Sequence, residues 1–184
     1  MTTRTSHLRH TLRTLPALVA GIIGCGGDGG RATQPVGFAF ASVSSGAEHS
    51  CALTTSGAAY CWGYNGSYSG FGPLGDGSVT PRSVPVAVTG DLTFSSVSPG
   101  REHTCGLTTN GAAYCWGFNV WGQLGNGSTE DAAVPVAVSG GLTFAGLSAG
   151  GTNSCGVNRG GIAYCWGDHI GKSSTVPVRV DGGP

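Results

Sequence analysis

The chain has 184 residues, of which 35 are glycine and only 10% are charged, and its formal net charge is zero. This length suits one modest domain, and the glycine content favours short strands joined by tight turns. Nucleic-acid binding requires a concentrated basic surface. No Lys/Arg cluster remains once the first 24 residues, which hold three of the nine basic residues, are set aside, so we expect no nucleic-acid partner.

Residues 1–24 predict a secretory signal peptide, because a basic segment without acidic residues precedes an apolar stretch, Leu15–Ile23, that is too short to span a membrane. The segment ends in Ile22-Ile23-Gly24-Cys25, which resembles the bacterial lipobox. The resemblance implies cleavage before Cys25 and acylation of that cysteine, which anchors the protein to a membrane. The alternative is an ordinary signal peptide that leaves Cys25 as a free thiol. Gly26 stands where Asp would favour inner-membrane retention, so the resemblance implies the outer membrane or the cell surface.

Three copies of one motif follow residues 25–37, a glycine-rich segment that we expect to be a flexible tether. Each copy ends in Ala-Tyr-Cys-Trp-Gly, and successive Cys-Trp-Gly steps stand 54 and 50 residues apart. A period of this length indicates a repeat architecture. We expect repeats at 38–90, 91–140 and 141–181.

Each repeat contains four short runs of β-branched and aromatic residues bounded by Gly, Pro, Ser and Asn, which is typical of strands. Four antiparallel strands form one blade of a β-propeller. The sequence therefore predicts an all-β fold of three four-stranded antiparallel blades. The expected strands are Phe38–Val43, Ser50–Leu53, Ala58–Trp62 and Val84–Val88, then Phe94–Val97, Thr104–Leu107, Ala112–Trp116 and Val134–Val138, then Phe144–Leu147, Ser154–Val157, Ile162–Trp166 and Val176–Val180.

The two middle strands of each repeat predict a hairpin with a three-residue loop and a left-handed glycine. In that register Cys51 lies opposite Cys61, close enough for a disulfide. We therefore predict one disulfide in each repeat, and export would provide the oxidising compartment. A zinc site is disfavoured because there is no Cys-x-x-Cys and the pairs fall in separate repeats. The predicted disulfides are Cys51–Cys61, Cys105–Cys115 and Cys155–Cys165.

The repeat resembles the regulator of chromosome condensation repeat. The resemblance rests on Gly-x-x-His-Ser-Cys-Ala-Leu with Ala-Tyr-Cys-Trp-Gly in the first copy, and on Trp121-Gly122-Gln123-Leu124-Gly125 in the second. The third copy departs from it, with Asn153 in place of histidine and Gly171-Lys172 where the Gly-Gln-Leu-Gly stretch should stand. The family implies a propeller that usually has seven blades. Three blades are too few for a closed ring, so the alternatives are an open arc, a truncated gene product, or a protomer that completes a ring with other chains. The atypical third copy also fits a capping repeat.

Two features could suggest catalysis or metal binding, and the repeats supply a simpler interpretation of each. Glu48-His49 and Glu102-His103 look like acid–base pairs, but their recurrence favours a hydrogen-bonding role. Asp76-Gly77-Ser78 lacks the alternating oxygen ligands of a calcium loop and is interpreted as a turn. We expect no catalytic set, no metal and no cofactor. The recurring strand aromatics lie on the strand face opposite the cysteines and are expected to form the core between blades; the alternative is an aromatic binding ladder. They are Tyr60 and Trp62, Tyr114 and Trp116, and Tyr164 and Trp166.

The loops that follow the Cys-Trp-Gly steps carry aromatic residues that are less easily explained as scaffold. Loops on a rigid framework commonly carry recognition, and Tyr and Trp are frequent binding hot spots. The candidate binding residues are Tyr64, Tyr68, Phe71, Phe118 and Trp121. The alternative is that Phe71 and Trp121 occupy a repeated aromatic position and only pack.

These features together predict a surface-anchored, non-catalytic scaffold module that binds a protein or another cell-envelope ligand. Family resemblance supplies two alternatives, a guanine-nucleotide exchange factor and an inhibitor of an envelope enzyme. The export signal, the extra cysteines and the lack of a basic cluster disfavour the exchange factor. A homo-oligomer that completes the propeller is a further expected partner arrangement.

Overall fold

The computed structural model describes residues 39–67, 70–169 and 172–181. The predicted signal peptide, Cys25, the tether and Tyr68 lie outside the described residues. Within these three ranges, no helix is long and apolar enough to cross a membrane.

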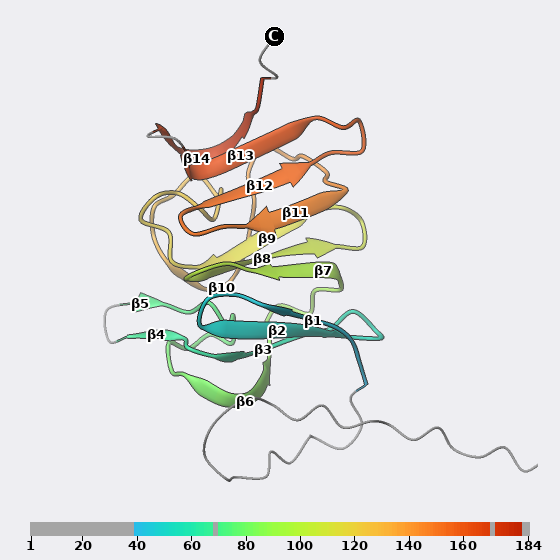
Figure 1. The fold of residues 1–184 in the computed structure, drawn as a ribbon, viewed down its shortest axis with the longest axis vertical. Helices are drawn as coiled ribbons and strands as arrows, with labels where there is room; N and C mark the ends of the chain where they lie inside the picture. Colours follow the sequence, from blue (N-terminus) through green and yellow to red (C-terminus); the bar gives the residue numbers. More distant parts are fainter. Residues whose placement is uncertain (1–38, 68–69, 170–171, 182–184) are drawn as a thin grey trace, which may run out of the picture. The chain divides into compact units, whose positions relative to one another are not determined.

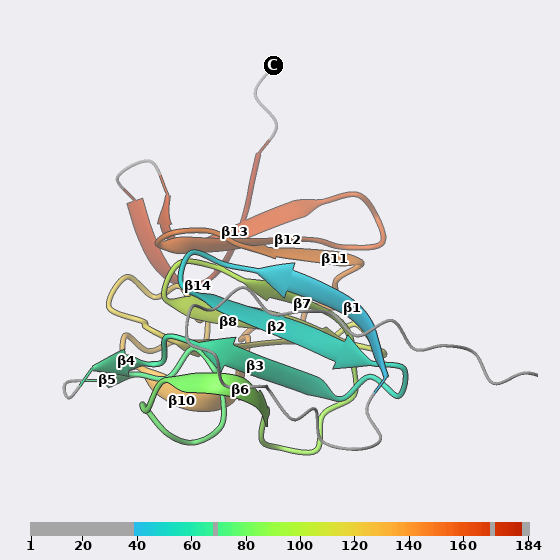
Figure 2. The same ribbon diagram turned by 60° about the horizontal axis from the view of Figure 1, so that its bottom comes forward.

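The described residues form three four-stranded antiparallel sheets, one for each repeat (Figures 1 and 2). Blade 1 has the strand order β1-β2-β3-β6, blade 2 has β7-β8-β9-β10 and blade 3 has β11-β12-β13-β14. The predicted all-β fold of three blades is confirmed. The strands are β1 (Phe40–Ser45), β2 (His49–Thr54), β3 (Ala59–Gly63), β6 (Arg82–Ala87), β7 (Phe94–Pro99), β8 (His103–Thr108), β9 (Ala113–Gly117), β10 (Ala132–Ala137), β11 (Gly146–Ala149), β12 (Asn153–Val157), β13 (Ala163–His169) and β14 (Lys172–Arg179).

The outer part of each repeat differs from the expected strand limits. In blade 3, β13 continues to His169 and β14 already begins at Lys172. The third repeat lacks the Gly-Gln-Leu-Gly stretch that forms a long loop elsewhere, so its last two strands can keep pairing toward their connection. In blade 1, the loop that follows Cys-Trp-Gly contains a small hairpin of β4 (Gly66–Ser67) and β5 (Gly70–Phe71).

The central hairpins have the predicted register. Cys51 lies opposite Cys61 and Leu53 opposite Ala59, with Gly57 at φ 84° in the turn. The structure contains the three predicted disulfides, each closing a sequence separation of 10 residues. A loop of that size is expected to contribute about 2–3 kcal/mol through chain entropy.

Two opposite faces of each blade build the core between blades. We call them the disulfide face, which carries the cystine and the aliphatic residue two positions after its first cysteine, and the tryptophan face, which carries the Cys-Trp-Gly tryptophan and the phenylalanine at or just before the first strand. The disulfide face of blade 1 packs against Trp116 and Phe94 of blade 2, and that of blade 2 packs against Trp166 and Phe144 of blade 3. The expectation that the strand aromatics form the core between blades is therefore confirmed for these two contacts.

A buried polar relay accompanies each of these contacts. His49 Nε2 lies 2.7 Å from Thr104 Oγ1 of the next blade, and that hydroxyl donates to the carbonyl oxygen of Pro73 at 2.8 Å. A hydroxyl has one proton, so Thr104 must accept from His49, which is then the neutral tautomer protonated on Nε2. His103, Ser154 and the carbonyl of Gln123 repeat the arrangement, with distances of 2.9 Å and 2.9 Å.

The relay explains the recurring histidines. Burial lowers the pKa of His49 to about 4, and burial together with repulsion from His49 lowers the pKa of His103 to about 4. Both histidines are therefore neutral near pH 7 and are held between blades, away from solvent. Their hydrogen-bonding role is confirmed.

Candidate functional site

The two long loops, residues 64–81 after β3 and 118–131 after β9, are each organised by one buried asparagine. Asn65 Nδ2 donates to the carbonyl oxygens of Ser78 and Thr80 at 3.0 and 3.1 Å, and its Oδ1 accepts from Leu74 N at 3.0 Å. Asn119 holds the second loop in the same way, through Ser128, Glu130 and Leu124 at 2.9–3.0 Å. Both asparagines are fully buried. Because each loop is closed around an internal hydrogen-bond donor, its outer side chains are presented from a defined backbone.

Asp76 closes the base of the first loop as a turn. Its Oδ1 accepts from the Ser78 N–H at 2.9 Å and from the Ser78 hydroxyl at 2.8 Å, and Arg82 Nε donates to Oδ2 at 3.1 Å. Partial burial raises the pKa of Asp76, but the hydrogen bonds from Ser78 and Arg82 and the charge of Arg82 outweigh it, so the pKa is lowered. The interpretation of Asp76-Gly77-Ser78 as a turn is confirmed.

Asp131 connects the two loops. Its Oδ1 accepts from the backbone N–H of Asn119 at 2.8 Å, and the carboxylate also accepts from the N–H of Phe71 on β5 of blade 1. Phe71 has a φ of 101°, which is a strained backbone conformation for a residue other than glycine. The Asp131 contact helps to hold that conformation. Partial burial raises the pKa of Asp131; the two N–H groups oppose this effect, and the neighbouring Glu130 adds to it.

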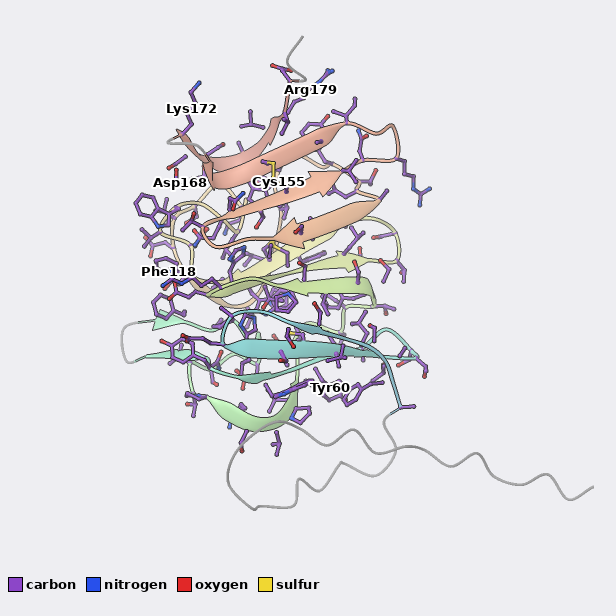
Figure 3. All side chains as sticks on the ribbon, in the orientation of Figure 1. Tyr60, Phe118, Cys155, Asp168, Lys172 and Arg179 are labelled. Carbon is purple, nitrogen blue, oxygen red and sulfur yellow. A yellow bond between two sulfur atoms is a disulfide. The ribbon has the colours of Figure 1, made fainter. Side chains whose placement is uncertain are left out.

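The aromatic rings of the two loops separate into a packed pair and an exposed group. Phe71 and Phe118 meet edge to face with their ring centroids 4.8 Å apart, so these two residues join blades 1 and 2. Figure 3 shows Phe118 at the edge of the molecule that carries β4 and β5. Trp121 is 44% exposed and the adjacent Val120 is 54% exposed. Exposed apolar groups next to each other on an ordered loop are the part of this edge that is available to a partner.

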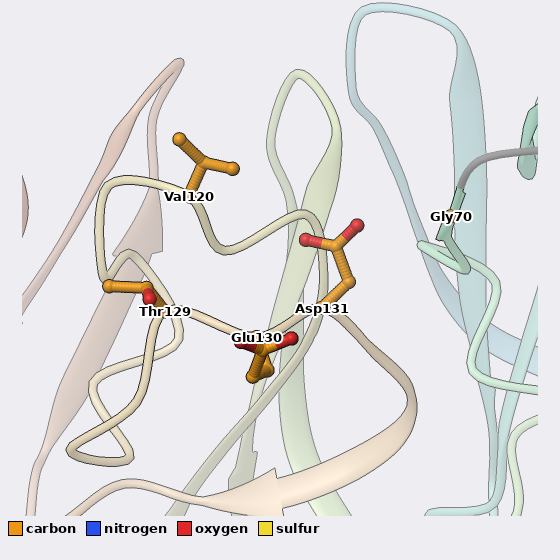
Figure 4. Close-up of a pocket in the computed structure, with 5 residues that line it drawn as sticks. All are labelled: Gly70, Val120, Thr129, Glu130 and Asp131. Atoms are coloured by element: carbon orange, nitrogen blue, oxygen red, sulfur yellow. The ribbon is translucent and has the colours of Figure 1, made fainter.

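A cavity of about 440 Å³ lies beside these exposed groups (Figure 4). Gly70 of blade 1 forms one wall, and four residues of the second loop form the other: Val120, Thr129, Glu130 and Asp131. This lining combines one apolar side chain, one hydroxyl and two carboxylates. The lining therefore presents hydrogen-bond acceptors and one apolar side chain to the space between the loops.

The structure brings together only part of the predicted binding set. Phe71, Phe118 and Trp121 lie on the same edge, and the aromatic alternative applies to Phe71, which packs, but not to Trp121, which is exposed. Tyr64 is half-buried on the first loop, where its backbone N–H donates to the Glu48 carbonyl at 2.9 Å. Tyr68 lies outside the described residues.

Sequence reasoning did not identify the two organising asparagines or the connecting role of Asp131. A signal for the asparagines was present, because Asn65 and Asn119 each stand two positions after the glycine of Cys-Trp-Gly. The third copy has Asp168-His169 after that glycine. No comparable signal existed for Asp131. Its equivalent in blade 1 is Pro81, and its two N–H partners are 12 and 60 residues away in the chain.

The chain matches models of the Regulator of chromosome condensation (RCC1) repeat over residues 40–69, 94–123 and 110–157. It is 42% identical over 79 residues to the ultraviolet-B receptor UVR8 of Arabidopsis thaliana, an alignment that covers 42% of this chain and 17% of that receptor. Human WBSCR16 superimposes with a TM-score of 0.70 at 23% identity, over 81% of this chain and 39% of that one. The Prp20p structure from Saccharomyces cerevisiae, described with its binding to Gsp1p and histones, superimposes with a TM-score of 0.64 at 23% identity, over 78% and 38%.

The chain therefore spans well under half the length of these relatives, and the two solved structures share its blade fold. The matched segments hold both cystines of the inner cores and Trp116, whereas Trp166 lies beyond them. The chain belongs to the RCC1 repeat family.

Proposed function

We propose that this protein is a surface-anchored, non-catalytic module that binds a protein partner through the edge formed by its two long loops. The observation that carries the proposal is the exposed pair Val120 and Trp121 beside the carboxylate-lined cavity. A rigid loop with an exposed tryptophan supplies a large contact area at little entropic cost. The binding of Gsp1p and histones described for Prp20p supports protein recognition as the use of this fold.

The side chains on this edge support recognition rather than bond chemistry. The lining residues are a glycine, a valine, a threonine and two acids, without a nucleophile paired to a base. The two histidines whose side chains the structure describes, His49 and His103, are neutral and buried between blades. The cavity and the exposed tryptophan therefore contribute contact area and hydrogen-bond acceptors.

Replacing Trp121 with alanine is expected to abolish partner capture without affecting folding. The measurement is affinity capture from a cell-envelope extract, with identification of the retained protein and titration of that purified protein against each variant. Loss of a hot-spot tryptophan should weaken binding by at least about 30-fold, equivalent to about 2 kcal/mol. The matched control is Val134→Ala, which removes a similarly exposed apolar side chain from β10. Equal binding by wild type, Trp121→Ala and Val134→Ala would contradict the proposed site.

Anchoring is a separate part of the proposal and rests on Cys25 within Ile22-Ile23-Gly24-Cys25. We expect metabolic labelling with palmitate in the wild-type protein and none in Cys25→Ser. The same change should move the protein from the membrane fraction to the soluble fraction, because one covalent lipid site supplies the anchor. Unchanged labelling of the serine variant would show that the lipobox interpretation is wrong.

The resemblance to the RCC1 repeat family supplies guanine-nucleotide exchange as a second candidate function. Purified protein mixed with a nucleotide-loaded small GTPase distinguishes the two. We expect no acceleration of nucleotide release, and an acceleration would replace the scaffold proposal with the exchange-factor one.

A further inference from the structure

Each contact between neighbouring blades joins a disulfide face to a tryptophan face. Within the described residues, this contact occurs twice, between blades 1 and 2 and between blades 2 and 3. Two faces remain outside these contacts: the tryptophan face of blade 1 and the disulfide face of blade 3. In Figure 3, blade 1, where Tyr60 is labelled, and blade 3, where Cys155 is labelled, lie at opposite ends of the three blades.

The free tryptophan face keeps the side chains that are buried in the other two blades. Trp62 is partly exposed, whereas Trp116 and Trp166 are 0% and 1% exposed. Val43 is 58% exposed, although the same position in the other blades, Val97 and Leu147, packs into the cores between blades. Val43 and part of Trp62 therefore remain accessible to solvent on this face, whereas the inner contacts cover the equivalent residues.

The free disulfide face shows the complementary exposure. Cys155 and Cys165 are partly exposed, whereas both cystines of the inner contacts are 0% exposed. Val157 is 40% exposed, but Leu53 and Leu107 at its position are 4% and 5% exposed. Val178, on β14, is 53% exposed, while the equivalent Val86 and Val136 pack into the inner cores.

We propose that two copies of this chain bind head to tail, the tryptophan face of blade 1 in one copy packing on the disulfide face of blade 3 in the other. The occupant follows from continuity with the inner contacts, since each free face is one half of an interface that the chain already makes twice. The polar positions also match. Ser50 stands where Thr104 and Ser154 accept from a histidine, and Asn153, which has an amide donor, stands where that histidine would be.

Backbone positions continue the same pattern. Ala47 N donates to Gly100 O and Arg101 N to Gly150 O, each at 3.1 Å between neighbouring blades. Gly151 of one copy and Gly46 of the other occupy the corresponding donor and acceptor positions. Gly46 and Gly100 also matter for approach, because a Cβ at either would lie 2.2 or 2.5 Å from the facing carbonyl oxygen. Gly150 occupies the equivalent position in blade 3, so the small residue needed for close contact is also present on the free disulfide face.

Blade 3 differs from the other blades in ways that set the strength of this contact. It lacks a counterpart of Leu74 and Leu124, the buried loop leucines of the inner cores, and Val157 is smaller than leucine. Among the described residues of blade 3, no carbonyl stands in the position of Pro73 O, which accepts from Trp116, so none is available to Trp62; Trp166 Nε1 likewise has no partner in its inner contact. The contact between copies is thus expected to be weaker than the inner ones and to depend on protein concentration.

Light scattering and sedimentation of the full chain over a concentration series test the proposal. We expect a mass of two or more chains at high concentration and the mass of a single chain on dilution. Trp62→Glu and Val178→Glu should each give a monomer at every concentration, because each variant loses one of the two complementary faces. An equimolar mixture of the two variants should recover a dimer, since Val178→Glu retains the tryptophan face and Trp62→Glu retains the disulfide face.

Controls distinguish this geometry from other associations. Val134→Glu places the same charge on an exposed residue of β10 in blade 2, away from both faces, and should assemble like wild type. Circular dichroism of all three variants should match wild type. A wild-type chain that stays monomeric overturns the proposal. Assembly of Trp62→Glu alone or Val178→Glu alone also overturns it, because like faces would then be in contact.

Discussion

Replacing Trp116 with alanine is expected to lower the free energy of unfolding by about 3–5 kcal/mol, the range for truncating a large buried aromatic. The Trp116 ring is fully buried between blades 1 and 2, its centroid lies 5.9 Å from that of Phe94, and its Nε1 donates to the Pro73 carbonyl at 2.8 Å. The change removes these contacts and leaves a cavity in a core made by two repeats. The measurement is urea unfolding followed by circular dichroism.

Trp121→Ala is the matched control for this change. It removes the same side chain from a position that is 44% exposed, and exposed substitutions of this kind usually alter stability by less than about 0.5 kcal/mol. The two variants should share the denaturant slope of wild type, so that the difference lies in the midpoint. Equal destabilisation by the two substitutions would show that Trp116 is not the residue that joins the blades.

The second large effect is a loss of stability in mild acid. The folded-state pKa values of His49 and His103 are lowered from 6.5 to about 4, so the unfolded chain binds protons in a pH range where the folded chain does not. The stability that depends on these neutral histidines is complete above pH 6.5 and is lost as the pH falls toward 4. Between pH 6.5 and 5 the expected loss is about 2 kcal/mol for each histidine. Thermal or urea unfolding at several pH values measures it.

His103→Asn separates the contribution of one histidine from general acid sensitivity. Blade 3 naturally carries asparagine at this position, as Asn153. The variant should be less stable than wild type at pH 7, because the bond to Ser154 is altered, but its stability should fall about half as steeply between pH 6.5 and 5. An unchanged pH dependence would mean that the buried histidine does not remain neutral in the folded protein.

The loop edge separates what composition can locate from what it cannot. Aromatic composition selects these two loops, and Trp121 is exposed there. Phe71 and Phe118 belong to the same candidate set, and their rings contact each other across two blades. Whether a loop aromatic packs or faces solvent depends on what the neighbouring blade places opposite it, and a single repeat does not carry that information.

The sequence by itself determined the features that depend on local geometry. The recurring motif is visible in the sequence, so the repeat period and the blade count could be predicted from it. Strand alternation, hairpin register and a left-handed glycine operate within about ten residues, so the pairing of Cys51 with Cys61 could be predicted as well. Only the tertiary structure decided what lies between blades. Residues tens of positions apart meet in the His49–Thr104–Pro73 relay and in the contact of Asp131 with Phe71. The exposure of the two free faces also depends on which blades are neighbours. Such contacts depend on how one rigid blade is placed on the next, and no local propensity specifies that placement.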